Sequence, residues 1–103
     1  MILEITQATY LSDYKLKIIF NQNIERLVDL ELELNGEIFI PLQDQEYFRS
    51  FFIDCGTISW SNGADIAPEY LYFISQSLSG TPNDEEKELE QKIRLLYTLQ
   101  NAG

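Results

Sequence analysis

The sequence of 103 residues contains no histidine and only one cysteine, Cys55. Without an imidazole, neither Cys55 nor a serine such as Ser59 or Ser61 has the usual base beside a nucleophile, so no catalytic residue is predicted. A zinc site needs several cysteine and histidine ligands, and one thiol cannot supply them. A lone thiol also cannot form an internal disulfide. It indicates a reducing compartment, and the cytoplasm is the expected location.

Basic residues and long apolar runs are scarce as well. Seven Lys and Arg stand against seventeen Asp and Glu, which gives a net charge of -10. Such a chain repels phosphate groups and anionic lipids, so direct binding to nucleic acid or to a membrane is not expected. No apolar run approaches the roughly 18 residues that span a bilayer, and the N-terminus lacks a signal-peptide pattern. The five glycines are scattered, so no phosphate-binding loop and no cofactor are predicted.

The residues that are present fit one domain of mixed structure. A length of 103 residues with 45% hydrophobic residues suits a single core. Alternating apolar residues, apolar runs and the turn pair Asn35-Gly36 predict extended segments. These are residues 2–5, 14–20, 24–34, 37–40, 51–53 (as a buried strand) and 57–60.

Three helices are predicted from capping residues and helical spacing. A short one begins at 44–48, and a second starts at Pro68 with its inner side formed by Tyr70, Leu71, Phe73 and Ile74. The third runs over 82–100, after a start signature at 81–84. Leu89, Ile93, Leu96 and Gln100 share one stripe of this helix, and Leu95 and Leu99 widen its apolar part. The fold class is therefore α+β, a small antiparallel-rich sheet covered by helices, with residues 1–78 as the domain and 79–103 as an added amphipathic helix.

The stretch from Trp60 to Pro68 is predicted to leave a strand and start a helix. Asn62 and Gly63 favour a turn, and Pro68 suits the first helical position. Because the residue before Pro68 is a poor cap, Asp65 is expected to accept hydrogen bonds from the free amides there. Trp60 at a strand end is typical of a core residue. If exposed, it would be an anchor for a partner.

Several segments together resemble a bacterial family, domain of unknown function 2442, over residues 2–74. They are Leu27-Val28-Asp29-Leu30, Pro41-Leu42, Asp44 with Tyr47-Phe48, and GTISWSNGADIAPEYLY at 56–72. The resemblance implies a small α+β protein with no established enzymatic activity. Some members are encoded beside a second small protein in arrangements similar to toxin-antitoxin pairs. The family usually has proline where this chain has Ser61, often has a turn or helix after Val-Asp-Leu, and commonly ends before the helix that starts near Pro82.

The leading functional hypothesis is a non-enzymatic module that binds a basic protein, for instance as an antitoxin-like neutraliser. Its binding residues are predicted on the terminal helix and at the lone tryptophan: Glu85, Glu86, Leu89, Ile93, Leu96, Leu99 and Trp60. The helix stripe suits either a homodimer or partner contact, or packing on its own domain. The carboxylates between 84 and 90 predict a solvated helix face rather than a calcium site.

Two other classes of function stay open. The acids of the terminal helix would imitate phosphates in a decoy that occupies a nucleic-acid-binding protein. Alternatively, Asp54 and Asp65 flank one predicted strand and would supply paired carboxylates for acid-base catalysis. Convergence of these two side chains in one cleft would favour the enzyme.

Overall fold

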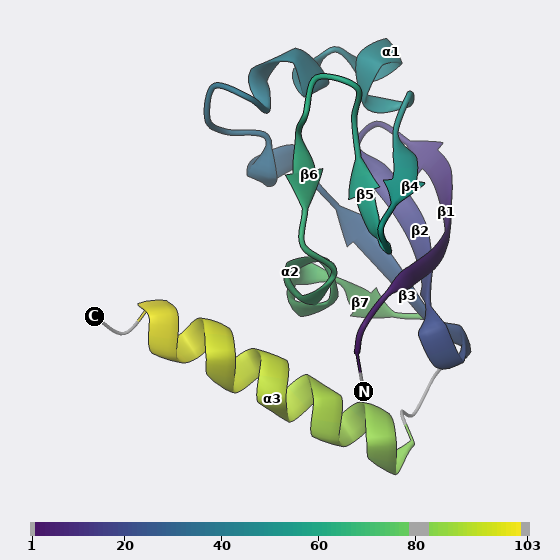
Figure 1. The fold of residues 1–103 in the computed structure, drawn as a ribbon, viewed down its shortest axis with the longest axis vertical. Helices are drawn as coiled ribbons and strands as arrows, with labels where there is room; N and C mark the ends of the chain where they lie inside the picture. Colours follow the sequence, from purple (N-terminus) through teal and green to yellow (C-terminus); the bar gives the residue numbers. More distant parts are fainter. Residues whose placement is uncertain (1, 79–82, 102–103) are drawn as a thin grey trace.

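The computed structural model describes residues 2–78 and 83–101, the last three of these by their backbone alone. It confirms an α+β fold of two small antiparallel sheets with helices, including a long C-terminal helix (Figure 1). No helix within the described ranges is long and apolar enough to cross a membrane.

The larger sheet has the order β1-β2-β3-β7. Its strands are β1 (Ile5–Ser12), β2 (Lys15–Phe20), β3 (Ile24–Asp29) and β7 (Gln76–Ser77). The alternation in β2 works as predicted, because Leu16, Ile18 and Phe20 are fully buried while the residues between them are partly exposed. Opposite them, β3 presents Val28, Arg26 and Ile24 in register. An arginine therefore occupies the central inward position of β3.

The smaller sheet has the order β4-β5-β6. Its strands are β4 (Phe52–Asp54), β5 (Thr57–Ser59) and β6 (Asp65–Ile66). Cys55 and Gly56 connect the first two with φ of 52° and 76°, the left-handed pair that a two-residue hairpin turn requires. The Ile5 amide donates to the Gly56 carbonyl at 2.8 Å, which joins the two sheets.

Three α-helices and three short 3-10 turns make up the other elements of the described residues. They are α1 (Gln45–Phe48), α2 (Pro68–Ile74), α3 (Asp84–Asn101), η1 (Asn21–Asn23), η2 (Glu31–Glu33) and η3 (Ile40–Gln43). α3 packs against α2 (Figure 1). The Asn83 side chain accepts a hydrogen bond from the Glu86 amide at 2.8 Å and so caps α3. The predicted start signature at Thr81 and Pro82 lies outside the described residues.

The strands predicted at 30–34 and 37–40 are wrong. After β3, the Asp29 carboxylate accepts from the Glu31 amide at 3.0 Å and turns the chain into η2, which leaves Leu32 84% exposed. Gly36, with φ of 89°, then starts a turn in which its carbonyl accepts from the amides of residues 39 and 40. The turn residues were read correctly, but they serve a loop and not a hairpin.

Three smaller predictions also fail. The first strand begins at Ile5 and not at residue 2, and the two-residue β7 had no sequence signal. β4 forms where a buried strand was predicted, yet it lies at the edge of the smaller sheet and its Phe52 and Ile53 are 46% and 39% exposed. In α2 the buried residues are Leu71 and Tyr72, whereas Phe73, predicted to face inward, is exposed.

Candidate functional site

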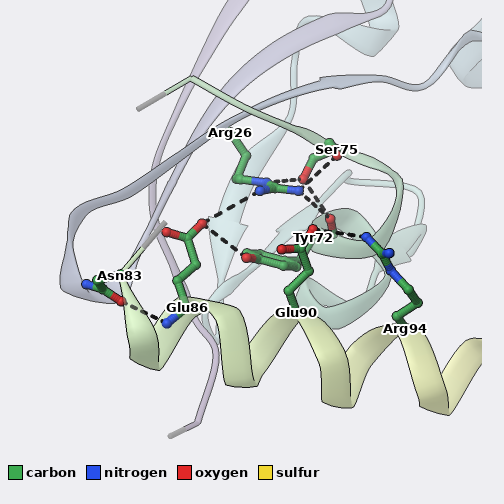
Figure 2. Close-up of polar contacts among 7 residues, drawn as sticks. All are labelled: Arg26, Tyr72, Ser75, Asn83, Glu86, Glu90 and Arg94. Atoms are coloured by element: carbon green, nitrogen blue, oxygen red, sulfur yellow. Dashed lines mark hydrogen bonds and ion pairs between the residues drawn. The ribbon is translucent and has the colours of Figure 1, made fainter. Parts of the chain in front are cut away.

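A buried polar cluster lies where α3 meets the larger sheet (Figure 2). Arg26, from β3, donates from Nε to the Ser75 hydroxyl at 2.8 Å and from Nη2 to the Ser75 carbonyl at 2.9 Å. Its Nη1 lies 3.6 Å from Oε1 of Glu86, and its guanidinium carbon lies 4.2 Å from the centre of the Tyr72 ring. The guanidinium of Arg26 is therefore held by several groups of its own chain.

Glu86 completes this cluster from the first turn of α3. The Tyr72 hydroxyl donates to Glu86 Oε1 at 3.1 Å (Figure 2). Burial raises the pKa of Tyr72 well above its usual value, and the Glu86 carboxylate adds to that rise while the Arg26 guanidinium opposes it. Because this carboxylate is buried and paired, the prediction that residue 86 lies on a solvated face is wrong. The cluster fixes α3 to the domain, and its Ser75 hydroxyl is engaged by Arg26 Nε and by the Tyr72 carbonyl.

The sequence held a signal for this cluster that the pattern analysis missed. In β3 the inward positions are Ile24, Arg26 and Val28, so an arginine interrupts an apolar alternation. A buried arginine needs a carboxylate partner, and any of the seventeen acids of the sequence could supply it. Which acid pairs with it was not decided by spacing.

A second feature is the acidic segment, residues 29–46. Between Arg26 and Arg49 the chain carries no base and six acids. The segment also exposes three large apolar side chains: Leu32 at 84%, Ile38 at 45% and Ile40 at 55%. Side-chain hydrogen bonds hold its backbone, including Asn62 Nδ2 to the Ile38 carbonyl at 2.9 Å and Gln43 Nε2 to the Leu34 carbonyl at 3.0 Å. Negative charge and exposed apolar surface thus coincide on one fixed loop.

A hollow of about 320 Å³ opens between the acidic segment, β6 and the start of α2. Its lining is mainly apolar, with one carboxylate from the acidic segment and one from β6: Glu33, Phe39, Asp65, Ile66, Ala67 and Tyr70. The Tyr70 hydroxyl donates to Glu33 Oε2 at 2.6 Å. Burial, followed by this hydrogen bond and the Glu33 charge, raises the pKa of Tyr70 to about 12. The tyrosine therefore stays neutral at physiological pH.

The structure separates the predicted binding residues into two groups. Trp60, Glu86 and Ile93 are 1%, 5% and 4% exposed, so they face the protein's own interior and are not available to a partner. Trp60 Nε1 donates to the Phe48 carbonyl at 2.9 Å, which satisfies its one polar group. Leu89 is half-buried against the core. Glu85 and Leu96 are exposed, and the side chain of Leu99 lies outside the described residues.

The predicted turn and helix start lie where expected, except for one role. The Asn62 side chain accepts from the Ala64 amide at 3.0 Å, and Gly63 has φ of 93°. Pro68 is the first residue of α2. Asp65, however, belongs to β6, and no amide of α2 donates a hydrogen bond to its carboxylate among the described residues; the N-cap of α2 is Ala67, whose side chain accepts none.

Asp54 and Asp65 do not converge. In the smaller sheet Ser59 pairs with Phe52 on one side and with Asp65 on the other, and Asp54 lies two residues beyond Phe52. Strand geometry therefore puts the two aspartates roughly 12 Å apart, too far to share a proton or an ion. Within residues 2–78 and 83–101, no three His, Cys, Asp or Glu side chains come together in a way that holds a metal ion.

Comparison with known families decides the relationship of the chain. A family described as "Protein of unknown function (DUF2442)" matches residues 5–77. The chain belongs to the DUF2442 family. No curated protein and no solved structure matches it. The resemblance drawn from the sequence is confirmed, and the matched range runs through β7.

The range matched by the DUF2442 family includes all of the acidic segment but only part of the buried polar cluster. It contains the acidic segment, the whole lining of the hollow, and Arg26, Tyr72 and Ser75 of the buried cluster. It ends before α3 and therefore excludes Glu86. In this chain α3 covers part of the DUF2442 domain and supplies the carboxylate that neutralises its buried arginine.

Proposed function

We propose that this DUF2442 protein is a non-enzymatic interaction module that binds a basic protein through its acidic segment. One observation supports this most directly: Leu32, Ile38 and Ile40 are exposed on a loop that has six acids and no base. Exposed apolar side chains among like charges are typical of a binding surface, where the apolar groups give affinity and the charges select and attract the partner.

The proposed surface differs from the helix stripe expected from the sequence. The exposed acids of α3, Asp84, Glu85 and Glu88, stand among the bases Lys87, Lys92 and Arg94, so its outer face has little net charge. The acidic segment has no such compensation. Leu95 and Leu96, exposed at 59% and 45%, remain the candidates for a homodimer contact through α3.

Capture from an extract of the host at low salt tests the proposal when it compares matched variants. One variant removes charge (Glu31→Gln, Glu37→Gln, Glu46→Gln), and another removes apolar surface (Leu32→Ser, Ile38→Ser, Ile40→Ser). The control removes three exposed acids elsewhere (Asp54→Asn, Glu85→Gln, Glu88→Gln). A basic protein held by the wild type and the control, but lost from both segment variants, supports the proposal. Equal retention by all four, or no basic partner, refutes it.

The antitoxin-like version makes a further demand on the partner. Expressed alone, the partner should arrest growth, and co-expression with this protein should restore it. Co-expression with the Leu32→Ser, Ile38→Ser, Ile40→Ser variant should not. If nucleic acid competes with this protein for the captured partner, the decoy hypothesis replaces neutralisation of a toxin.

We also propose a cytoplasmic location, which suits the exposed free thiol of Cys55.

A further inference from the structure

The hollow beside the acidic segment is lined by two kinds of residue. Phe39, Tyr70, Ile66 and Ala67 supply apolar surface, and Glu33 and Asp65 supply two carboxylates. No lysine or arginine lines it. Its volume of about 320 Å³ is at the lower end of the range for small-ligand sites, which suits one long side chain better than a cofactor.

The two carboxylates at the hollow take no part in an ion pair among the described residues. The ion pairs among the described residues join Lys17 to Glu25, Arg26 to Glu86 and Arg94 to Glu90, and neither Glu33 nor Asp65 takes part in one. Glu33 uses Oε2 for the Tyr70 hydroxyl, and its Oε1 accepts no hydrogen bond from a described residue. A cation entering the hollow would therefore meet negative charge that the protein itself leaves unneutralised.

The aromatic wall is held in place before any ligand arrives. The Tyr70 ring packs against the Tyr97 ring in a T-shaped arrangement, with ring centroids 5.4 Å apart. Its centroid also lies 6.3 Å from that of the Phe73 ring. Its hydroxyl is fixed by Glu33. The Phe39 amide donates to the Gly36 carbonyl at 3.0 Å, which fixes the backbone on the opposite side. A fixed site loses little conformational entropy on binding.

We infer that this hollow binds the side chain of an arginine presented by a basic protein segment. A guanidinium is planar, stacks on aromatic rings, and donates several hydrogen bonds to carboxylates, which matches both the aromatic and the acidic residues of the lining. An arginine's methylene groups also bury well against Ile66 and Ala67. This inference rests on the proposed function and names the group that the basic partner contributes.

Titration of the full chain, followed by amide shifts in NMR, tests the inference with Nα-acetyl-arginine amide as the probe. Its neutral isostere, Nα-acetyl-citrulline amide, and Nα-acetyl-lysine amide are the comparison probes. The arginine probe should give saturable shifts at Ile66, Ala67 and Tyr70, the citrulline probe none, and the lysine probe weaker binding. Equal shifts with citrulline or lysine, or shifts centred elsewhere, overturn the inference.

Charge variants separate a site from general attraction. Glu33→Gln with Asp65→Asn should weaken arginine binding about fivefold at low salt, since two partly exposed ion pairs are lost. Asp54→Asn with Glu85→Gln removes the same amount of charge away from the hollow and should change the affinity for the arginine probe less than twofold. Equal weakening in both overturns the inference. If the first variant does not fold, Asp65→Asn alone, at an exposed position, should still weaken binding about twofold, and no weakening overturns the inference.

The inference and the proposed function fail separately. If a captured basic partner depends on Leu32, Ile38 and Ile40 but is held equally by Glu33→Gln with Asp65→Asn, the hollow does not take its arginine and the interaction module stands. If no basic partner is held through the acidic segment, the proposed function fails whatever the arginine probe shows.

Discussion

Glu86 places a carboxylate oxygen 3.6 Å from the guanidinium of Arg26, although one residue lies in the first turn of the C-terminal helix and the other in the middle of β3. Each side chain is 7% exposed. A charge buried to this extent is costly unless it is paired and hydrogen-bonded, so each of the two residues depends on the other. The position of α3 on the domain is thus tied to the neutralisation of one arginine.

Replacing Glu86 by Gln should destabilise the protein by about 3 kcal/mol, because Arg26 keeps its buried charge and loses its counter-ion. Urea denaturation of the full chain measures this. Glu85→Gln, one residue earlier and exposed, is the control and should change the free energy of unfolding by less than about 0.5 kcal/mol. Equal effects of the two changes would show that the pair contributes nothing.

Asn83→Ala should cost about 1 kcal/mol, since the cap of α3 is lost and the Glu86 amide is left without its acceptor. The loss should be visible as reduced helicity in far-UV circular dichroism on mild heating. Gln91→Ala, at an exposed position within α3, should leave the melting temperature nearly unchanged. A matching loss at both positions would contradict a capping role for residue 83.

Tyr70 should make stability depend on alkaline pH. Its pKa is raised to about 12 in the folded chain by burial and by Glu33, against 10.0 ordinarily. Below pH 10 the hydroxyl is neutral in both states, and between pH 10 and 12 only the unfolded state ionises. This contribution to stability is therefore full below pH 10 and is lost as the pH rises toward 12.

Denaturation at pH 9 and at pH 11 checks the Tyr70 prediction. The wild type should lose more stability between these pH values than Tyr70→Phe, which carries no titrating hydroxyl at this position. Tyr72, whose pKa is also raised, is common to both proteins and cancels in the comparison, whereas Tyr97 helps to raise the pKa of Tyr70 and is part of the measured effect. Identical pH dependence would mean that Tyr70 ionises equally in both states.

In a spectrophotometric titration, Glu33→Gln should lower the pKa of Tyr70.

Trp60→Phe should destabilise the fold by about 2 kcal/mol, because the Phe48 carbonyl loses its buried donor. Denaturation followed by circular dichroism gives the value without relying on the indole signal. Tyr47→Phe, which removes a hydrogen bond to the Ser61 hydroxyl at an exposed site, should cost well under half as much. If Trp60→Phe leaves the free energy of unfolding unchanged, the hydrogen bond of the indole N–H does not contribute to stability.

The sequence predicted correctly those elements whose structure depends on one residue type or on one short alternation of apolar residues. The alternation of Leu16, Ile18 and Phe20 identified β2, and Asn62 with Gly63 identified a turn. The strands predicted after residue 30 failed because the same apolar spacing, Leu30, Leu32 and Leu34, suits a strand or a 3-10 turn that exposes its middle residue. The Asp29 side chain, which accepts from the Glu31 amide, favours the 3-10 turn, and this effect does not appear in the alternation.

The sequence by itself determined the family, the α+β class, the excess of negative charge and the lack of imidazole chemistry, since each depends on residue identity or local order. Only the tertiary structure decided which acid meets Arg26, which apolar residues stay outside, and that Glu33 and Asp65 share one hollow. These depend on contacts between segments far apart in the chain. Because side chains of one type are interchangeable until the backbone places them, composition counts seventeen acids but does not say which one is buried.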